Sequence, residues 1–440
     1  MIKYKSYEDY KETGITWLTM VPKHWEILRT DSVTVYIRNQ INPDEIKSEF
    51  VFHYSIPAVQ ETGTGQYDLT EEVGSAKQLI TKKSVLISKL NPRKATICIA
   101  EPKDEITICS SEFIAMEAKK CDLKYLFYLM NSEMNRQRLD AKVQSVTRSH
   151  QRVYPSDIYR FWTALPSTTE QQAIASFLDR ETARIDALIQ KKERMIELLK
   201  EKRIALITQA VTKGLDPNVP MKDSGIEWLG EVPEHWTVLK FKNIGSFQGG
   251  AGFPDDEQGL EDEEIPFYKV SDMNLPGNET YMCQHNNSVS RETALKLRAS
   301  ILRKNTIVFA KVGAALLLNR RRIITKDSCI DNNMMGFSTT HCDVMWCYFF
   351  LFQLDLGKLV NPGAVPSVNE SQMSNIPVCV PPTQEQKQIG DYLVTETTKI
   401  NKMIDKVNAS IIQLSEYRAS LIHHAVTGKI DLRGHDAHAQ

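Results

Sequence analysis

The feature that most constrains the fold is a short apolar and aromatic segment that occurs twice in the chain. The first copy is "TGITWLTMVPKHW", Thr13–Trp25, and the second is "SGIEWLGEVPEHW", Ser224–Trp236. When Gly14 is aligned with Gly225, both tryptophans, the proline and the histidine of the segment align as well. Because an internal repeat fixes the architecture before local patterns do, we expect the chain to build one arrangement twice.

A second pair of matching segments predicts two long helices, over residues 166–213 and 380–428. "LPSTTEQQAIASFLDRETARID", Leu165–Asp186, is matched by "VPPTQEQKQIGDYLVTETTKIN", Val380–Asn401. Each copy starts with a proline and a capping-box pattern, and a glycine follows where the helical pattern stops. The predicted capping boxes are Ser167 with Glu170 and Thr383 with Gln386, and the glycines are Gly214 and Gly428.

Both predicted helices carry a mostly apolar stripe with alternating steps of four and three residues, in which Lys192, Arg203 and Arg418 occupy the polar positions. This spacing is typical of a coiled-coil seam, and the two stripes match position by position, which favours pairing within the chain. The predicted seam residues are Ile185, Ile189, Ile196, Leu199, Leu206, Ile400, Ile404, Val407, Ile411, Leu414 and Leu421.

The long middles between the repeats differ from each other in letters but agree in order. Each is rich in β-branched and aromatic residues with turn signals, and each contains one short apolar helical stretch, Leu123–Met130 or Met345–Phe352. The predicted fold class is therefore α+β, with two mixed domains of one fold. The predicted boundaries are 1–165 and 214–379 for the domains, 166–213 and 380–428 for the helices, and 429–440 for a C-terminal tail.

Composition narrows the class of protein. Hydrophobic residues make up 42% and charged residues 25%, as in soluble globular proteins. No apolar run is long enough to span a bilayer, so we expect no membrane partner, and the cysteine pattern indicates reduced thiols in a cytoplasmic protein. The eight cysteines show no metal-ligand spacing, and no metal site is predicted. A net charge of -1 does not itself indicate nucleic acid, but phosphate binding needs only a local basic patch.

The chain shows no catalytic signature. It lacks the G-x-x-x-x-G-K-[ST] phosphate-binding loop, and it shows no methyl-donor site. We therefore predict a non-catalytic chain with no cofactor of its own. Two similar pairs of segments that flank dissimilar middle regions suggest that one partner is bound twice and that each middle region recognises a different target. Duplex DNA, as a linear target with elements at fixed spacing, suits that logic.

These residues resemble a known family, the specificity (S) subunits of type I restriction–modification enzymes. The helix starts "PSTTEQQAI" and "PPTQEQKQI", the "GI-WL---VP-HW" segments and the strand-rich middles carry the resemblance, over essentially the whole chain. It implies two pseudo-symmetric mixed α/β target-recognition domains, each reading one half of a bipartite, asymmetric double-stranded DNA site. It also implies two long antiparallel coiled-coil helices that set the spacing and dock two copies of a methyltransferase (M) subunit.

The same resemblance assigns the chemistry to partner subunits. The methyltransferase would carry S-adenosylmethionine, and nuclease-translocase (R) subunits, which use ATP and Mg, would join the full complex. Methylation and cleavage would then reside outside this chain.

Loop residues rich in hydrogen-bond donors are the candidate DNA contacts. Arginine and asparagine supply bidentate base contacts, whereas lysine mainly binds phosphate. The first domain offers Lys89, Asn91, Arg93 and Lys94, and a second cluster of Arg148, Ser149, His150 and Arg152. The second domain offers Lys311, aligned with Lys89, the run Asn319, Arg320, Arg321 and Arg322, and Ser367 and Asn369 at the place of the second cluster.

Two other functions remain open from the sequence. A protein–protein scaffold with two equivalent docking arms would use the same repeats without DNA. A self-sufficient DNA-modifying enzyme would need a methyl-donor or nucleotide site. Steep salt dependence distinguishes DNA binding from an apolar scaffold interface, because phosphate contacts release counterions.

Overall fold

The computed structural model describes residues 4–147, 150–360 and 365–434. The chain divides into two compact units. Unit 1 combines Met1–Glu193 with Asn408–Gln440, and unit 2 consists of Arg194–Val407. Among the described residues, no helix is long and apolar enough to cross a membrane.

Unit 1 is built on two sheets. The strand orders are β10-β9-β12-β4 and β5-β8-β11-β6-β7, and every pair in them is antiparallel except β11 with β6. Outside these sheets lie the pairs β1-β2, β13-β14 and β15-β3. The elements are β1 (Tyr10–Ile15), β2 (Leu18–Pro22), β3 (Glu26–Arg29), β4 (Thr34–Ile37), β5 (Gln40–Ile41), β6 (Phe50–Tyr54), α1 (Ile56–Thr62), β7 (Gln66–Leu69), β8 (Lys77–Leu79), β9 (Ser84–Ser88), β10 (Ile97–Ala100), β11 (Thr107–Ser110), β12 (Phe113–Ala118), α2 (Leu123–Asn131), α3 (Glu133–Asp140), β13 (Gln144–Thr147), β14 (His150–Arg152), α4 (Pro155–Tyr159) and β15 (Trp162–Leu165).

Unit 2 has a five-stranded sheet of order β19-β26-β23-β24-β21 and a three-stranded sheet of order β22-β20-β25. The pairs β16-β17 and β18-β27 complete it. The elements are β16 (Met221–Asp223), β17 (Glu231–Pro233), β18 (Thr237–Lys240), β19 (Gly245–Gly249), β20 (Ile265–Tyr268), β21 (Tyr281–Met282), β22 (Ser288–Val289), α6 (Arg291–Lys296), β23 (Ile307–Ala310), α7 (Ala314–Leu317), β24 (Arg321–Ile324), β25 (Cys329–Ile330), β26 (Met334–Thr339), α8 (Val344–Gln353), α9 (Glu370–Asn375) and β27 (Pro377–Val380).

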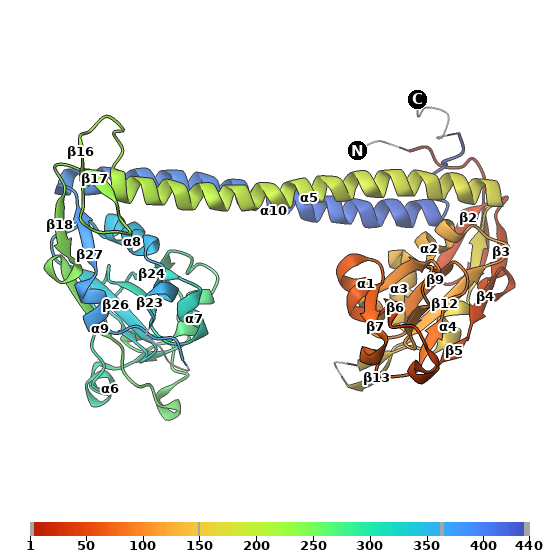
Figure 1. Ribbon diagram of the computed structural model, residues 1–440, viewed down its shortest axis with the longest axis horizontal. Coiled ribbons are helices and arrows are strands. Elements are labelled where there is room, and N and C mark those ends of the chain that lie inside the picture. The colour runs from red at the N-terminus through yellow and green to blue at the C-terminus, as the bar shows by residue number, and fades with distance from the viewer. Residues whose placement is uncertain (1–3, 148–149, 361–364, 435–440) are drawn as a thin grey trace. The chain divides into compact units, whose positions relative to one another are not determined.

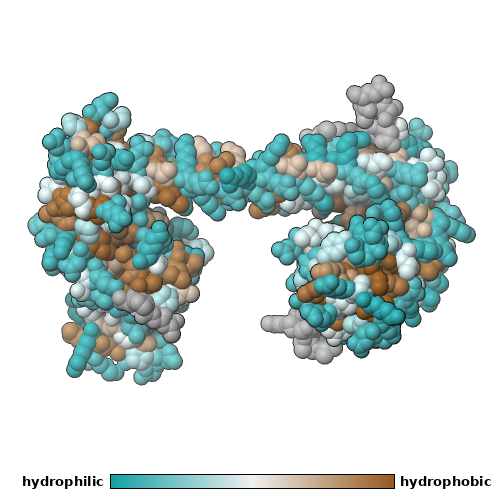
Figure 2. Space-filling model, viewed as in Figure 1, coloured by the Kyte–Doolittle hydropathy of each residue, from teal (hydrophilic) through white to brown (hydrophobic). Residues whose placement is uncertain are grey.

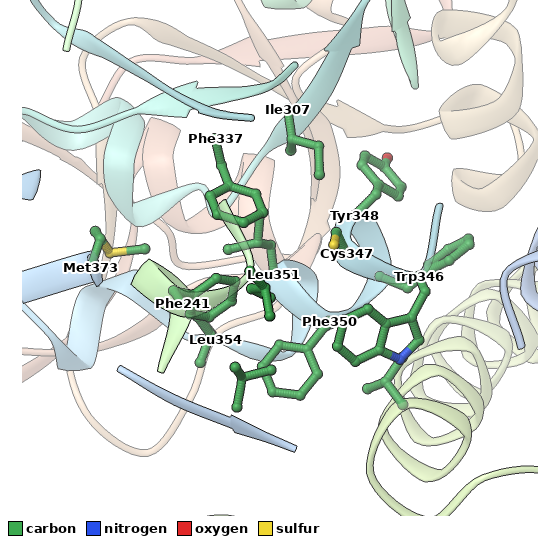
Figure 3. Close-up of a cluster of buried hydrophobic side chains, with 14 of the residues drawn as sticks. Phe241, Ile307, Phe337, Trp346, Cys347, Tyr348, Phe350, Leu351, Leu354 and Met373 are labelled. Atoms are coloured by element: carbon green, nitrogen blue, oxygen red, sulfur yellow. The ribbon is translucent and has the colours of Figure 1, made fainter. Parts of the chain in front are cut away.

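The short helix α8 forms the apolar centre of unit 2 (Figure 3). Trp346 and Phe350 are fully buried, and the Phe350 ring meets Phe241 edge to face with centroids 5.8 Å apart. A helix that is apolar on all sides is stable only when it is surrounded. The same cluster includes Ile207 and Val211, which belong to a long helix, so burial of α8 also holds that helix on the domain.

Two long helices, α5 (Thr168–Lys213) and α10 (Thr383–Val426), each contribute one part to unit 1 and one part to unit 2 (Figure 1). Their bounds lie within three residues of the predicted ranges 166–213 and 380–428. Every predicted seam residue is buried or half-buried. Apolar residues off that stripe, such as Ile204 and Ile412, are exposed instead.

The two helices contact each other in each unit. In unit 1 the Arg418 Nε atom donates to Asp186 Oδ1 at 2.9 Å. In unit 2 the Arg203 Nη1 atom donates to Asn401 Oδ1 at 2.8 Å. Asp186 is aligned with Asn401 and Arg203 with Arg418 at the same offset of 215 positions (401 − 186 and 418 − 203), so matched positions make both helix–helix contacts.

The repeated segment is held by a glutamate at the start of the long helix that follows it. In unit 1 the Trp25 Nε1 atom donates to Glu170 Oε1 at 3.1 Å, and His24 Nε2 lies 2.8 Å from Glu170 Oε2. In unit 2 the corresponding distances are 3.2 Å from Trp236 to Glu385 and 2.8 Å from His235. The tryptophan and histidine therefore recur because each fastens its domain to a helix start.

The glutamine after each glutamate fastens the apolar helix of the domain. The Gln171 side chain accepts from the Asp122 backbone N–H at 2.8 Å, and Gln386 accepts from Asp343 at 2.8 Å. Asp122 and Asp343 are the N-cap residues of α2 and α8. The first predicted capping box is half confirmed, because the Ser167 hydroxyl accepts from the Glu170 backbone N–H at 3.3 Å. The reciprocal side-chain half is wrong for Glu170 and Gln386, because these side chains bind tertiary partners instead.

Candidate nucleic-acid interface

In unit 1 the structure brings the two sequence-predicted clusters together. The Val153 backbone N–H donates to the Lys89 carbonyl at 3.1 Å, and the Asn91 N–H donates to the Gln151 carbonyl at 2.8 Å. The loop that follows β9 is therefore tied to the end of β14. We call Lys89–Asn91 with Gln151–Val153 the loop pair of unit 1.

Unit 2 has a loop pair with the same hydrogen bonds. The Val368 N–H donates to the Lys311 carbonyl at 3.0 Å, and the Gly313 N–H donates to the Pro366 carbonyl at 2.8 Å. Its loop pair is Lys311–Gly313 with Pro366–Val368. Lys311 therefore stands where Lys89 stands in unit 1, as the sequence alignment predicted.

A third hydrogen bond and the backbone conformation extend this equivalence. The Lys89 N–H donates to the Glu112 carbonyl and the Lys311 N–H donates to the Asn333 carbonyl, both at 2.8 Å. Each accepting residue directly precedes a central strand, β12 or β26. The turn residues match too, since φ is +48° at Asn91 and +78° at Gly313.

The charged side chains in and beside the unit 1 loop pair are mostly cationic. Arg152 donates to Glu112 Oε1 at 2.8 Å, and Lys89 Nζ lies 4.0 Å from Glu112 Oε2. Arg93 pairs with Asp140 at 2.6 Å, while Lys94 is exposed. The predicted contacts Arg148 and Ser149 lie outside the described residues, and only the backbone of His150 is described.

The unit 2 loop pair carries fewer charges. Ser367 lies at the position of Arg152, since the bridges Val312–Ser367 and Leu90–Arg152 correspond. The predicted contact Asn369 is exposed, but its side chain caps α9 by accepting from the Gln372 N–H at 2.9 Å.

The sequence did not single out Asn333, the counterpart of Glu112. Asn333 is exposed, and its side-chain amide has no hydrogen-bond partner among the described residues. It lines an open pocket of about 360 Å³ together with Lys269, Ser271 and Ala315. A search of the sequence for basic clusters could not identify Asn333, because its side chain is neutral. The backbone hydrogen bond from Lys311 to Asn333 is what indicates that Asn333 belongs to this site.

The structure corrects the prediction for Arg321, which is fully buried and cannot reach DNA. Its guanidinium donates to the Asn319 carbonyl at 2.5 Å and to the Leu354 carbonyl at 2.7 Å. It also lies 6.0 Å from the centre of the Phe309 ring. Burial lowers the pKa of the Arg321 guanidinium to about 10. Arg321 therefore binds the interior of unit 2.

The neighbours of Arg321 also serve the fold. Asn319 has a φ of +56°, and its side chain accepts from the Leu356 N–H at 3.1 Å. Arg322 donates to the Met273 carbonyl at 3.0 Å, and burial lowers the pKa of its guanidinium. Arg320, half-buried, donates to the Asn274 side chain. The densest cationic run in the sequence is thus largely occupied by contacts within unit 2.

Comparison with known families covers most of the chain. The family model described as "Type I restriction modification DNA specificity domain" matches twice, over residues 22–198 and 233–411. Each match spans most of one mixed domain and the first part of the long helix that follows it.

Individual relatives agree with this match. The specificity subunit of the type I restriction enzyme MjaVIII from Methanocaldococcus jannaschii is 21% identical, over 98% of each chain. That of EcoBI from Escherichia coli is 23% identical, over 76% of this chain and 71% of its own.

Solved structures share the fold. One is a chain of a structure that describes complex assembly and conformational transition of the type I R-M system. It aligns with a TM-score of 0.76 and 15% identity, over 93% of this chain and 99% of that chain. The HsdS subunit from Thermoanaerobacter tengcongensis aligns with a TM-score of 0.54 and 15% identity, over 93% and 98%.

Proposed function

Because the chain belongs to the family of type I restriction–modification DNA specificity subunits, we propose that it reads a bipartite, asymmetric DNA site with one loop pair per half-site. The observation that carries this proposal is the equivalence of the two loop pairs. The same backbone hydrogen bonds present Lys89 and Lys311, while the side chains beside them differ. An identical frame with unlike side chains is what two different half-sites require, because bases are distinguished by side-chain chemistry.

In this proposal the lysines and the exposed arginines supply different kinds of contact. Lys89, Lys94 and Lys311 bind phosphates, which orients each unit on the duplex without selecting a sequence. Arg152, Arg93 and the amides near the loop pairs contact base edges. Arg321 has no part in it, because it is buried.

The two long helices act as the spacer and as a docking surface for two methyltransferase subunits. Asp186 of α5 contacts Arg418 of α10, and Arg203, later in α5, contacts Asn401, earlier in α10. Opposite residue order along the two helices supports an antiparallel coiled coil. The visible face of the helices is largely hydrophilic with scattered apolar residues (Figure 2). Exposed apolar side chains off the seam, Leu198, Ile204, Met403 and Ile412, suit a protein partner.

The chemistry of the complex then lies in the partners. The methyltransferase subunits supply S-adenosylmethionine and the methylated adenine, and the nuclease-translocase subunits use ATP and Mg. The complex works in the cytoplasm, and this chain selects the site.

The test is long-read detection of methylated adenine in a host that expresses this chain with its methyltransferase subunit. We expect a bipartite motif with an unspecified gap, lost when the chain is deleted. A complex that assembles but methylates no motif would leave a protein–protein scaffold.

Matched variants assign the half-sites. Lys89→Ala and Lys311→Ala should each weaken binding of the complex, and each should reduce the slope of log affinity against log salt by about 1. Hydroxyl-radical footprints should show lost protection in opposite half-sites. Loss in the same half-site would contradict the assignment of one loop pair to each.

A further inference from the structure

The two loop pairs differ most at two equivalent positions. Unit 1 has Glu112 and Arg152, whereas unit 2 has Asn333 and Ser367. In unit 1 the Arg152 Nη2 atom donates to Glu112 Oε1 at 2.8 Å, and the side chains are 61% and 23% exposed. Unit 2 thus lacks both members of this charge pair.

We propose that Arg152, held by Glu112, reads a guanine in the half-site of unit 1, and that Glu112 is its positioning residue. This inference rests on the proposed function and deepens it. A guanidinium fork matches the N7 and O6 acceptors of guanine in the major groove. One nitrogen of Arg152 is bound to the carboxylate, and the exposed remainder of the fork is free to meet a base edge.

The carboxylate decides between a base and a phosphate as the target of Arg152. The opposite charges of Arg152 and Glu112, 2.8 Å apart, largely cancel, so this pair adds little attraction to a phosphate and the net positive charge of the cluster is left to Lys89. A neutral base edge requires no net positive charge. The pair also holds a long side chain in place before DNA arrives, which reduces the ordering cost on binding.

Glu112 itself is poorly placed to read a base. Its Oε1 atom is occupied by Arg152, and its Oε2 atom is buried without a hydrogen-bond partner in the described structure, 4.0 Å from Lys89 Nζ. The cytosine amino group, which a glutamate can bind, would need one of these oxygens. Glu112 therefore acts through Arg152.

The experiment uses the complex of the full chain with its methyltransferase subunits and duplexes that carry the mapped site. Each base pair of both half-sites is replaced in turn, and affinities are measured for the unaltered chain, Arg152→Lys and Glu112→Gln. The matched control is an exposed Arg–Glu pair in unit 2, Arg291 with Glu264 at 2.8 Å, changed in the same way.

We expect one G·C pair at which the unaltered complex discriminates about 10- to 100-fold against replacement. Arg152→Lys, which keeps the charge but loses the fork, should remove most of that discrimination at this pair alone. Glu112→Gln should reduce it at the same pair, and the control changes should leave it intact. Unchanged discrimination in the unit 2 half-site shows that each variant complex is folded.

Two results would overturn the inference. If Arg152→Lys or Glu112→Gln alters affinity equally for all duplexes, Arg152 contacts a phosphate. If Glu112→Gln leaves the G·C discrimination unchanged, Glu112 has no positioning role. Failure of the proposed function is distinguishable, because the unaltered chain would then direct no bipartite methylation.

Discussion

The two units have similar sequences at their helix starts but not at their loop pairs, and the kind of contact made in each region explains the difference. At the helix starts the repeated contacts use side chains: Trp25 and His24 bind Glu170, and Trp236 and His235 bind Glu385. At the loop pairs the repeated contacts use only backbone atoms. A contact made by side chains requires particular residue types, whereas a contact made by backbone atoms can form with almost any residue. Sequence likeness therefore marks the scaffold, and its loss marks the surface that varies.

The largest effect should come from the buried tryptophans of the scaffold. Trp25 and Trp236 are both at most 1% exposed. Trp25→Ala and Trp236→Ala should each lower the free energy of unfolding of their own unit by about 3–5 kcal/mol. Denaturant unfolding, followed by hydrogen exchange in each unit, measures both, and the Trp→Phe variants serve as milder controls. A large cost in one unit alone would show that the two anchors are not equivalent.

Replacement of Arg321 should lower the free energy of unfolding nearly as much, and only that of unit 2. Arg321→Met leaves the Asn319 and Leu354 carbonyls without their buried donor, which should cost about 2–4 kcal/mol. Arg320→Met, at the neighbouring half-buried position, should change stability by less, within about 1 kcal/mol. Thermal unfolding compares the two. Equal costs would mean that the buried hydrogen bonds of Arg321 contribute little.

The two helix-start glutamates should differ because one has an extra donor. Glu170 accepts a hydrogen bond from the Tyr7 hydroxyl at 2.6 Å in addition to its tryptophan and histidine. Glu170→Gln should therefore cost about 1.5–3 kcal/mol, and more than Glu385→Gln. In a Tyr7→Phe background the two costs should become similar. A greater cost at Glu385 would contradict the assignment of the third donor.

The smallest change in stability should come from Asn333, with an effect on recognition. Its exposed amide can bind the N6 and N7 atoms of adenine. Asn333→Ala should reduce discrimination at one A·T pair of the unit 2 half-site by about 1–3 kcal/mol. Stability should stay within about 0.5 kcal/mol of the unaltered chain. Base-by-base affinities of the complex measure this, and lost discrimination at a G·C pair would assign a different role.

Much of the scaffold could be predicted from sequence because its signals are local. The periodic stripes and the proline starts placed α5 and α10, and the apolar stretches Leu123–Met130 and Met345–Phe352 do form helices α2 and α8. The match of Lys89 with Lys311 succeeded because both directly follow a buried strand.

The candidate site was predicted less well because it depends on strand facing and on distant contacts. The sequence shows three adjacent arginines, but only the packing of β24 within unit 2, beside Phe309 and the Leu354 carbonyl, decides that Arg321 points inward. Asn333 lies in no cationic cluster, and its relation to Lys311 exists only across the sheet. The tertiary partners of Glu170 were not predicted because the local capping-box pattern already accounted for a glutamate at this position.

The division of unit 1 has a consequence for how the protein is made. Its core combines Trp25 and Leu178 with Leu421, Val426 and Leu432, from the far end of the chain. Unit 2 is continuous and can fold as it leaves the ribosome. The unit whose synthesis begins first must therefore wait for Arg194–Val407 to be translated, on the order of ten to forty seconds at about 5–20 residues per second. During that interval the apolar surface that Leu421, Val426 and Leu432 cover stays exposed, and we expect the nascent chain to be a substrate for chaperones.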